Sequence, residues 1–227
     1  MVENFQLSRK GFQMPKKKDN ALLSPKFALA LQFANEIHST QVRKGIGAPY
    51  ISHLMAVCAL VLEYGGDETQ AISALLHDSA EDCGGRPMLE TVRLLFGDDV
   101  ARIVESCTDT FDDPKPAWRP RKEAYLASIT EKPASGKLVA CADKFHNLGH
   151  TLRDIEIDGV TAWKNRMKVT PNGDAEKQVW YYIGCLNALS NSWTHPILAE
   201  YGRAVIRLCS LVGSPVDVAE ATKLASR

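Results

Sequence analysis

The sequence lacks two features that would each place it in a special class of protein. Its longest strongly apolar stretch, residues 54–62, is far shorter than the roughly 20 residues that a membrane-spanning helix needs. Its cysteines are too widely spaced to form the paired motifs of zinc or redox sites: Cys58, Cys83, Cys107, Cys141, Cys185 and Cys209. These absences exclude a membrane-spanning protein and a disulfide-stapled miniprotein, and they favour an ordinary globular chain.

The sequence also has no excess of charge of either sign. Its 27 Lys and Arg residues balance its 27 Asp and Glu residues, so the net charge is zero. A protein that binds nucleic acid is usually basic, and we therefore expect no nucleic acid partner. Residues 1–20 are basic but carry no apolar run after their charges, which argues against a secretory signal. Together with unpaired cysteines, this predicts a cytoplasmic protein.

Apolar residues recur at helical spacing along most of the chain, and no sustained period-two alternation is present. Ser24 before Pro25 predicts the start of a first helix, and Asp67 followed by Gln70 predicts a capping box. We expect the helix after Asp67 to run on through residues 77–82. A helix over 137–153 is expected to pack by one face only, and the polar segment 158–174 carries no helical signal. The prediction is an all-α fold.

Four residues have the side chains of a metal site and are expected on three different helices. They are two imidazoles and two carboxylates: His53, His77, Asp78 and Asp143. Two nitrogen and two oxygen donors leave coordination positions for water on an octahedral ion such as Mn²⁺ or Fe²⁺. We therefore predict one divalent metal ion in an open, catalytic site.

Two further acids follow one helical turn later, since Glu81 lies four residues after His77 and Asp82 lies four after Asp78. With Asp78 and Asp143 they would place four carboxylates near one point, an arrangement that needs a cation between them. The alternative is a solvated helix end beside a core histidine. We favour the metal site because four ligand-type residues occur together.

These residues belong to motifs that resemble the HD hydrolase domain of the RelA/SpoT family, in particular its stand-alone small alarmone hydrolases. The matching motifs lie between Phe27 and Leu152: Arg43-Lys44, Pro49-Tyr50-Ile51-Ser52-His53, Leu76-His77-Asp78 with Glu81-Asp82, Thr108-Asp109, and Ala142-Asp143-Lys144 with His146-Asn147-Leu148. The resemblance implies a Mn²⁺-dependent enzyme that removes the 3′-diphosphate from (p)ppGpp.

The resemblance also implies a role for each matching residue. His53, His77, Asp78 and Asp143 would hold the metal, and Glu81 and Asp82 would position or activate water. Arg43, Lys44 and Asn147 would contact the nucleotide, and we add Thr151 and Tyr181 as candidate substrate contacts. The isolated basic residues Arg119, Arg121 and Lys122 are expected to be solvent-exposed, and His38, His146 and His195 to be structural.

The predicted organisation has three parts. Residues 1–20 form a flexible polar arm, 21–195 form the HD hydrolase domain, and 196–227 form a C-terminal helical appendage packed on that domain. The expected partner is a small nucleotide. We expect no membrane partner, and the chain could form a homo-oligomer. Two alternatives remain open: another nucleotide phosphohydrolase, such as a 5′-nucleotidase or an NADPH phosphatase, and a non-catalytic nucleotide sensor.

Overall fold

The structure is a computed structural model that describes residues 22–43, 47–112, 114–168 and 174–214. Within these residues the regular structure is helical apart from an isolated β-bridge between Val42 and Pro49, which confirms the all-α prediction. The helices are α1 (Pro25–Ile37), α2 (Ile51–Glu63), α3 (Glu68–Leu76), α4 (Ser79–Cys83), α5 (Gly85–Phe96), α6 (Asp98–Cys107), α7 (Trp118–Ile129), α8 (Ala134–Asp158), α9 (Val160–Lys168), α10 (Ala175–Ser190) and α11 (Pro196–Val212).

Local capping signals set where the first helices begin. The Ser24 side chain accepts a hydrogen bond from the backbone N–H of Lys26, and Pro25 occupies the first helical position. At α3, the Asp67 carboxylate accepts from the N–H of Gln70 while the Gln70 side chain accepts from the N–H of Asp67. Both predicted helix starts are therefore confirmed.

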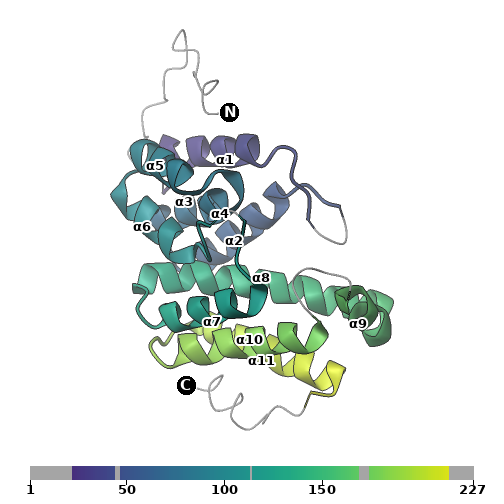
Figure 1. Cartoon of the computed structure of the whole chain (residues 1–227). Helices are drawn as coiled ribbons and strands as arrows, with labels where there is room; N and C mark the ends of the chain where they lie inside the picture. The colour runs from purple at the N-terminus through teal and green to yellow at the C-terminus, as the bar shows by residue number, and fades with distance from the viewer. Residues whose placement is uncertain (1–21, 44–46, 113, 169–173, 215–227) are drawn as a thin grey trace.

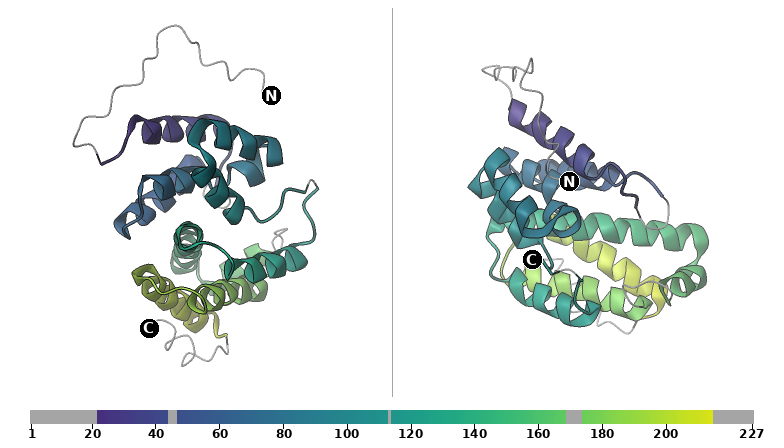
Figure 2. Two further views of the ribbon diagram at one scale, coloured as in Figure 1. Left: turned by 90° about the vertical axis from the view of Figure 1, so that its left-hand side faces the viewer. Right: turned by 45° about the horizontal axis from the view of Figure 1, so that its top comes forward.

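Helix α8 lies between two groups of helices (Figure 1). One group, α1 to α6, packs on it through α2, α3 and α6, and the other packs through α10 and α11. Figure 2 shows the same arrangement with α8 seen between the two groups. Residues 136–143 of α8 are consequently buried on every side. The expectation that α8 packs by one face only is wrong for this part, because neighbours cover it from both directions.

Two sequence-based expectations about the helices need correction. The segment 158–174, which carries no helical signal, contains α9, and that helix places Trp163 in the core at 1% exposure. The helix expected through residues 77–82 is interrupted, since α3 ends at Leu76 and α4 starts at Ser79.

The predicted division of the chain is only partly visible in the structure. Helix α11, in the predicted appendage, packs against α8 and α10, and the Tyr201 hydroxyl donates to the backbone carbonyl of Tyr182. The predicted arm, residues 1–20, lies outside the described residues, so the three-part division stays a prediction. Among the described residues, no helix has both the length and the apolar composition to cross a membrane.

Candidate metal centre

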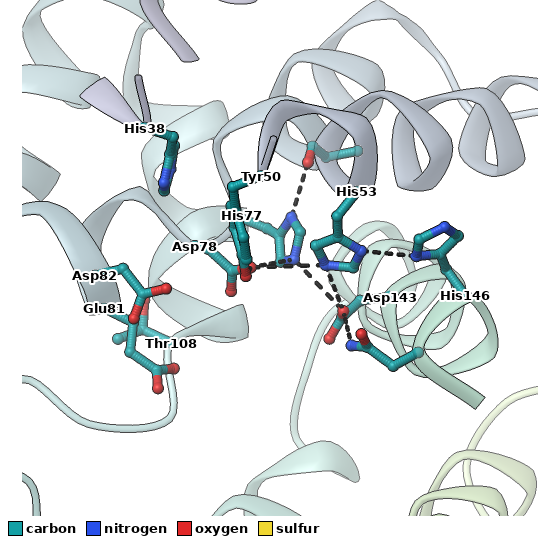
Figure 3. Close-up of polar contacts among 12 residues, drawn as sticks. His38, Tyr50, His53, His77, Asp78, Glu81, Asp82, Thr108, Asp143 and His146 are labelled. Carbon is teal, nitrogen blue, oxygen red and sulfur yellow. Dashed lines mark hydrogen bonds and ion pairs between the residues drawn. The ribbon is translucent and has the colours of Figure 1, made fainter. Parts of the chain in front are cut away.

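The predicted metal ligands converge where α2, α3 and α8 meet (Figure 3). His53 lies in α2, His77 caps the C-terminus of α3, and Asp143 lies in α8. One ligand atom from each of these three residues lies within 4.8 Å of the others, and all three side chains are buried. Asp78, directly after His77, brings its carboxylate Oδ2 to 3.0 Å from His77 Nε2 and 3.7 Å from His53 Nε2.

His77 is held with one ring nitrogen aimed at the carboxylates. Its Nδ1 lies 2.8 Å from the backbone carbonyl oxygen of Ala74, which can only accept, so Nδ1 carries the proton. The buried Nε2 makes no hydrogen bond, although Oδ2 of Asp78 is 3.0 Å away and Oδ1 of Asp143 is 3.6 Å away. A nitrogen lone pair facing two carboxylate oxygens repels them unless a cation lies between. This donor set therefore fits a divalent metal ion.

Charge effects at His77 agree with this geometry. Burial alone would lower its pKa, but the carboxylates of Asp78 and Asp143 raise the pKa well above the usual range. A raised pKa means that the site favours a positive charge at Nε2. A metal ion supplies that charge without a proton.

His53 completes the nitrogen donors of the cluster. Its Nε2 lies 3.1 Å from Oδ1 of Asp143, and its Nδ1 lies 2.7 Å from Nδ1 of His146. Burial lowers the pKa of His53, partly offset by Asp143, so the ring favours the neutral form that ligates metals.

Neighbouring groups fix both carboxylates. The Tyr50 hydroxyl donates a 2.6 Å hydrogen bond to Oδ2 of Asp78, and the Asn147 amide donates one of 2.6 Å to Oδ1 of Asp143. Lys144 Nζ lies 2.5 Å from Oδ2 of Asp143. Burial would raise the pKa of Asp143, but Lys144 and the two histidines hold that pKa well below its usual range. Both oxygens of Asp143 are thus oriented and ionised.

The two acids predicted to act on water form a separate pair beside the cluster. Figure 3 shows Glu81 and Asp82 to one side of the histidines. Lys115 Nζ lies 2.9 Å from Glu81 and 3.1 Å from Asp82, and Gln41 donates to Asp82 at 2.9 Å. The expectation that four carboxylates converge on one point is therefore wrong: the break between α3 and α4 turns the second pair toward Lys115.

A cavity of about 600 Å³ lies against this acid pair. Its lining includes Glu81, Asp82 and Lys115, with Arg86 and Phe111 on the wall formed by the start of α5 and the loop after α6. The volume is in the range of small-molecule sites.

The predicted substrate contacts do not all face the cluster. Arg43 donates a 2.8 Å hydrogen bond to Oδ1 of Asn147, so these two lie together beside Asp143. The Thr151 hydroxyl is instead 3.3 Å from the Tyr182 hydroxyl. Tyr181 is buried at 6% exposure, and its hydroxyl has no hydrogen-bond partner. Lys44 lies outside the described residues.

Of the three basic residues of α7, Arg119 is exposed as expected, whereas Arg121 and Lys122 are not. Arg121 and Lys122 both pair with the buried carboxylate of Asp109, and their side chains are only 11% and 16% exposed. The Arg119 guanidinium stacks on the Trp180 ring at 3.4 Å. Asp109 lies in the loop after α6 and Trp180 lies in α10, so a short basic motif could not reveal these contacts.

Sequence reasoning missed three residues of the site. Tyr50 was predicted only as part of a family motif, His146 was expected to be structural, and Lys115 had no predicted role. The spacing Tyr50-x-x-His53 offered one usable signal, because residues three apart share a helix face. No local signal placed His146 against His53, since that contact joins α8 to α2.

Comparisons with known proteins match the chain to one family. A family model described as HD domain matches residues 30–158. The chain is 35% identical over 157 residues to the guanosine-3′,5′-bis(diphosphate) 3′-pyrophosphohydrolase MESH1 of Xenopus tropicalis, a match that covers 68% of this chain and 76% of that protein. It is 40% identical over 121 residues to a probable GTP pyrophosphokinase of Mycobacterium leprae, covering 52% of this chain but only 15% of that protein.

A solved structure gives the same result. The chain superposes with a TM-score of 0.63 and 27% identity on a protein described as a metazoan ortholog of SpoT that hydrolyzes ppGpp. That match covers 83% of this chain and 97% of the solved one. The chain therefore belongs to the HD-domain family, in the group that includes the MESH1 guanosine-3′,5′-bis(diphosphate) 3′-pyrophosphohydrolases.

Proposed function

We propose that this protein is a guanosine-3′,5′-bis(diphosphate) 3′-pyrophosphohydrolase, which converts ppGpp to GDP, or pppGpp to GTP, with release of pyrophosphate. One observation carries the proposal: the buried Nε2 of His77 has no hydrogen-bond partner and faces Asp78 and Asp143 beside His53. This is a donor set for a divalent ion. The MESH1 relative is named for this reaction.

His53, His77, Asp78 and Asp143 are the proposed ligands, and Mn²⁺ is the proposed ion. Two imidazole nitrogens with carboxylate oxygens suit Mn²⁺ and leave positions open for water and substrate. When bound, such an ion lowers the pKa of a water molecule and neutralises charge on phosphoryl oxygens. The chain itself contributes the oriented, ionised carboxylate of Asp143, held by Asn147 and Lys144.

Glu81 and Asp82 are the proposed groups that position water and accept its proton. Both carboxylates line the cavity of about 600 Å³, so a water molecule there can reach them. Lys115 bridges the two acids and keeps them side by side. Removal of a proton from attacking water by such a group typically contributes a factor of about 10² to 10⁴ in rate.

Arg43 and Asn147 are the best-supported nucleotide contacts, because they lie together next to Asp143. Lys44 follows Arg43 in the sequence and is proposed to act with it. Thr151 and Tyr181 have less support, since their hydroxyl groups lie against Tyr182 and in the core. The proposed substrate is a free nucleotide, and the proposed compartment is the cytoplasm. We propose no nucleic acid or membrane partner. The active protein is either a single chain or a homo-oligomer.

A nucleotide panel tests this function against the two alternatives. Metal-free protein is supplied with Mn²⁺ and offered ppGpp, pppGpp, nucleoside monophosphates and NADPH, and the products are separated by ion-exchange chromatography. The proposal expects GDP or GTP with pyrophosphate. Release of inorganic phosphate from a monophosphate or from NADPH alone would assign another phosphohydrolase. Binding of ppGpp without any product would indicate a sensor.

A further inference from the structure

The two histidines of the metal cluster differ in what holds their second ring nitrogen. Nδ1 of His77 lies 2.8 Å from the carbonyl oxygen of Ala74, and Nδ1 of His53 lies 2.7 Å from Nδ1 of His146. A carbonyl only accepts, so His77 always carries its proton on Nδ1 and keeps Nε2 free for a ligand. A neutral imidazole can donate or accept. The contact with His146 therefore permits either tautomer of His53.

Each tautomer of His53 satisfies a different set of partners. In the first, Nε2–H of His53 donates to Oδ1 of Asp143, 3.1 Å away, and Nδ1 accepts from Nδ1–H of His146. In the second, Nδ1–H of His53 donates to His146, and Nε2 is bare. Both rings keep one proton in both arrangements. Only the second arrangement leaves a lone pair on Nε2 that can bind a cation.

We infer that His146 is a positioning residue, which accepts the hydrogen bond from Nδ1–H of His53 and so stabilises the tautomer that ligates the metal. The inference rests on the proposed metal centre. Figure 3 shows His146 next to the ring nitrogen of His53 that is not directed at Asp143. The two ring centroids are 4.9 Å apart with an interplanar angle of 34°. Because His146 and Asp143 are both in α8, one helix presents a ligand and also orients a second ligand.

Substitutions at this position can separate the hydrogen bond from ring packing. In His146→Phe the ring is kept and the acceptor is lost. In His146→Asn the amide oxygen branches from Cγ as Nδ1 does, so an acceptor returns without the ring. His150→Phe is the matched control, because His150 is also partly buried in α8 and its ring centroid lies 4.7 Å from that of His146.

The test measures metal binding and does not depend on hydrolysis. Metal-free proteins are titrated with Co²⁺, followed by visible absorption, and with Mn²⁺, followed by electron paramagnetic resonance. We expect His146→Phe to weaken binding by about 10- to 100-fold, the usual effect of losing a partner of a metal-bound histidine. The Co²⁺ spectrum should change with it. His146→Asn should recover most of the affinity, and His150→Phe should match the unsubstituted protein.

Three outcomes would overturn the inference. They are unchanged affinity in His146→Phe, equal losses in the Phe and Asn variants, and an equal loss in His150→Phe. If His146→Phe does not fold, nitrogen NMR of the unsubstituted protein with Zn²⁺ decides instead: the inference requires a proton on Nδ1 of His53 and Zn²⁺ on Nε2. If the metal affinity is the same with and without His146, only this inference is contradicted. If the protein binds the metal but does not hydrolyse ppGpp, only the proposed function is contradicted.

Discussion

The guanidinium of Arg43 donates a 2.8 Å hydrogen bond to the side-chain oxygen of Asn147, and the same amide donates to Asp143 at 2.6 Å. Both were predicted as nucleotide contacts, and the structure shows that they also bind each other. The Arg43 side chain stands beside the metal cluster, 5.8 Å from the Tyr50 ring centroid. Asn147 of α8 thereby holds the loop residue Arg43 next to the cluster.

Replacing Arg43 by alanine is expected to raise the KM for ppGpp more than it lowers kcat. A loop that holds the nucleotide equally in the ground state and the transition state affects mainly binding. Loss of one charge-assisted hydrogen bond corresponds to about 1.5 to 3 kcal/mol, or roughly 10- to 100-fold in KM. Steady-state kinetics checks this, with Arg102→Ala as control, because the Arg102 side chain in α6 is exposed. An unchanged KM would remove Arg43 from the substrate site.

The amide variants Glu81→Gln and Asp82→Asn are expected to keep the metal and lose rate. An amide cannot accept a proton from water, so kcat should fall by about 10²- to 10⁴-fold if these acids act as general bases. Metal content by atomic absorption, measured beside kcat, distinguishes this role from ligation. If Glu81 and Asp82 only end a helix in solvent, kcat should be nearly normal in both variants. If the variants lose the metal, the result would instead identify Glu81 and Asp82 as metal ligands.

Chelation is expected to abolish hydrolysis, and Mn²⁺ is expected to restore it. Without a metal ion, the positive charge that Asp78 and Asp143 favour at His77 Nε2 comes only from a proton, which cannot activate water for attack. The variants His53→Ala and Asp143→Ala should fail to retain Mn²⁺, although the two residues lie in different helices. Metal content after gel filtration is the measurement. Full activity in chelator-treated protein, or normal metal content in both variants, would refute the proposed centre.

The metal-free protein is expected to lose stability in acid through Asp143. Lys144 and the histidines hold the pKa of Asp143 well below its usual range despite burial. An unfolded chain has an aspartate pKa of about 3.9. The ionised carboxylate therefore stabilises the fold fully above that pH, and this stabilisation is lost as the pH falls toward the folded pKa.

Urea unfolding of the metal-free protein between about pH 2.5 and 6 measures this effect. The free energy of unfolding should drop below about pH 4, and the drop should be smaller in Asp143→Asn. The exposed Asp112 provides the control variant Asp112→Asn, which should keep the full drop. Equal acid sensitivity in Asp143→Asn and the unsubstituted protein would contradict the prediction.

Truncation of Trp163 is expected to destabilise the protein strongly. This side chain is 1% exposed in α9, and α9 packs on α8 and α10. Removing a buried tryptophan typically costs about 3 to 5 kcal/mol. Chemical denaturation of Trp163→Ala should show this loss, whereas Leu94→Ala, at 86% exposure in the unsubstituted protein, should change stability little. A loss below about 1 kcal/mol in Trp163→Ala would show that α9 contributes little to the core.

Much of the fold was readable from local sequence signals. Ser24 with Pro25 and Asp67 with Gln70 each specify a helix start, because the side chain that satisfies the exposed N–H groups lies within three residues of them. The signal failed at α9, whose composition is polar although its single tryptophan is buried. Burial there depends on α8 and α10, which only the folded chain brings next to it.

The sequence by itself determined the chemistry of the site: which side chains can bind a metal, and the family motifs in which they occur. Only the tertiary structure decided their partners. It set Glu81 and Asp82 apart from the cluster, placed His146 against His53, and turned Thr151 toward Tyr182. The physical reason is that residue type fixes what a side chain can donate, accept or ligate, whereas its partners depend on how α2, α3, α8 and α10 pack against one another.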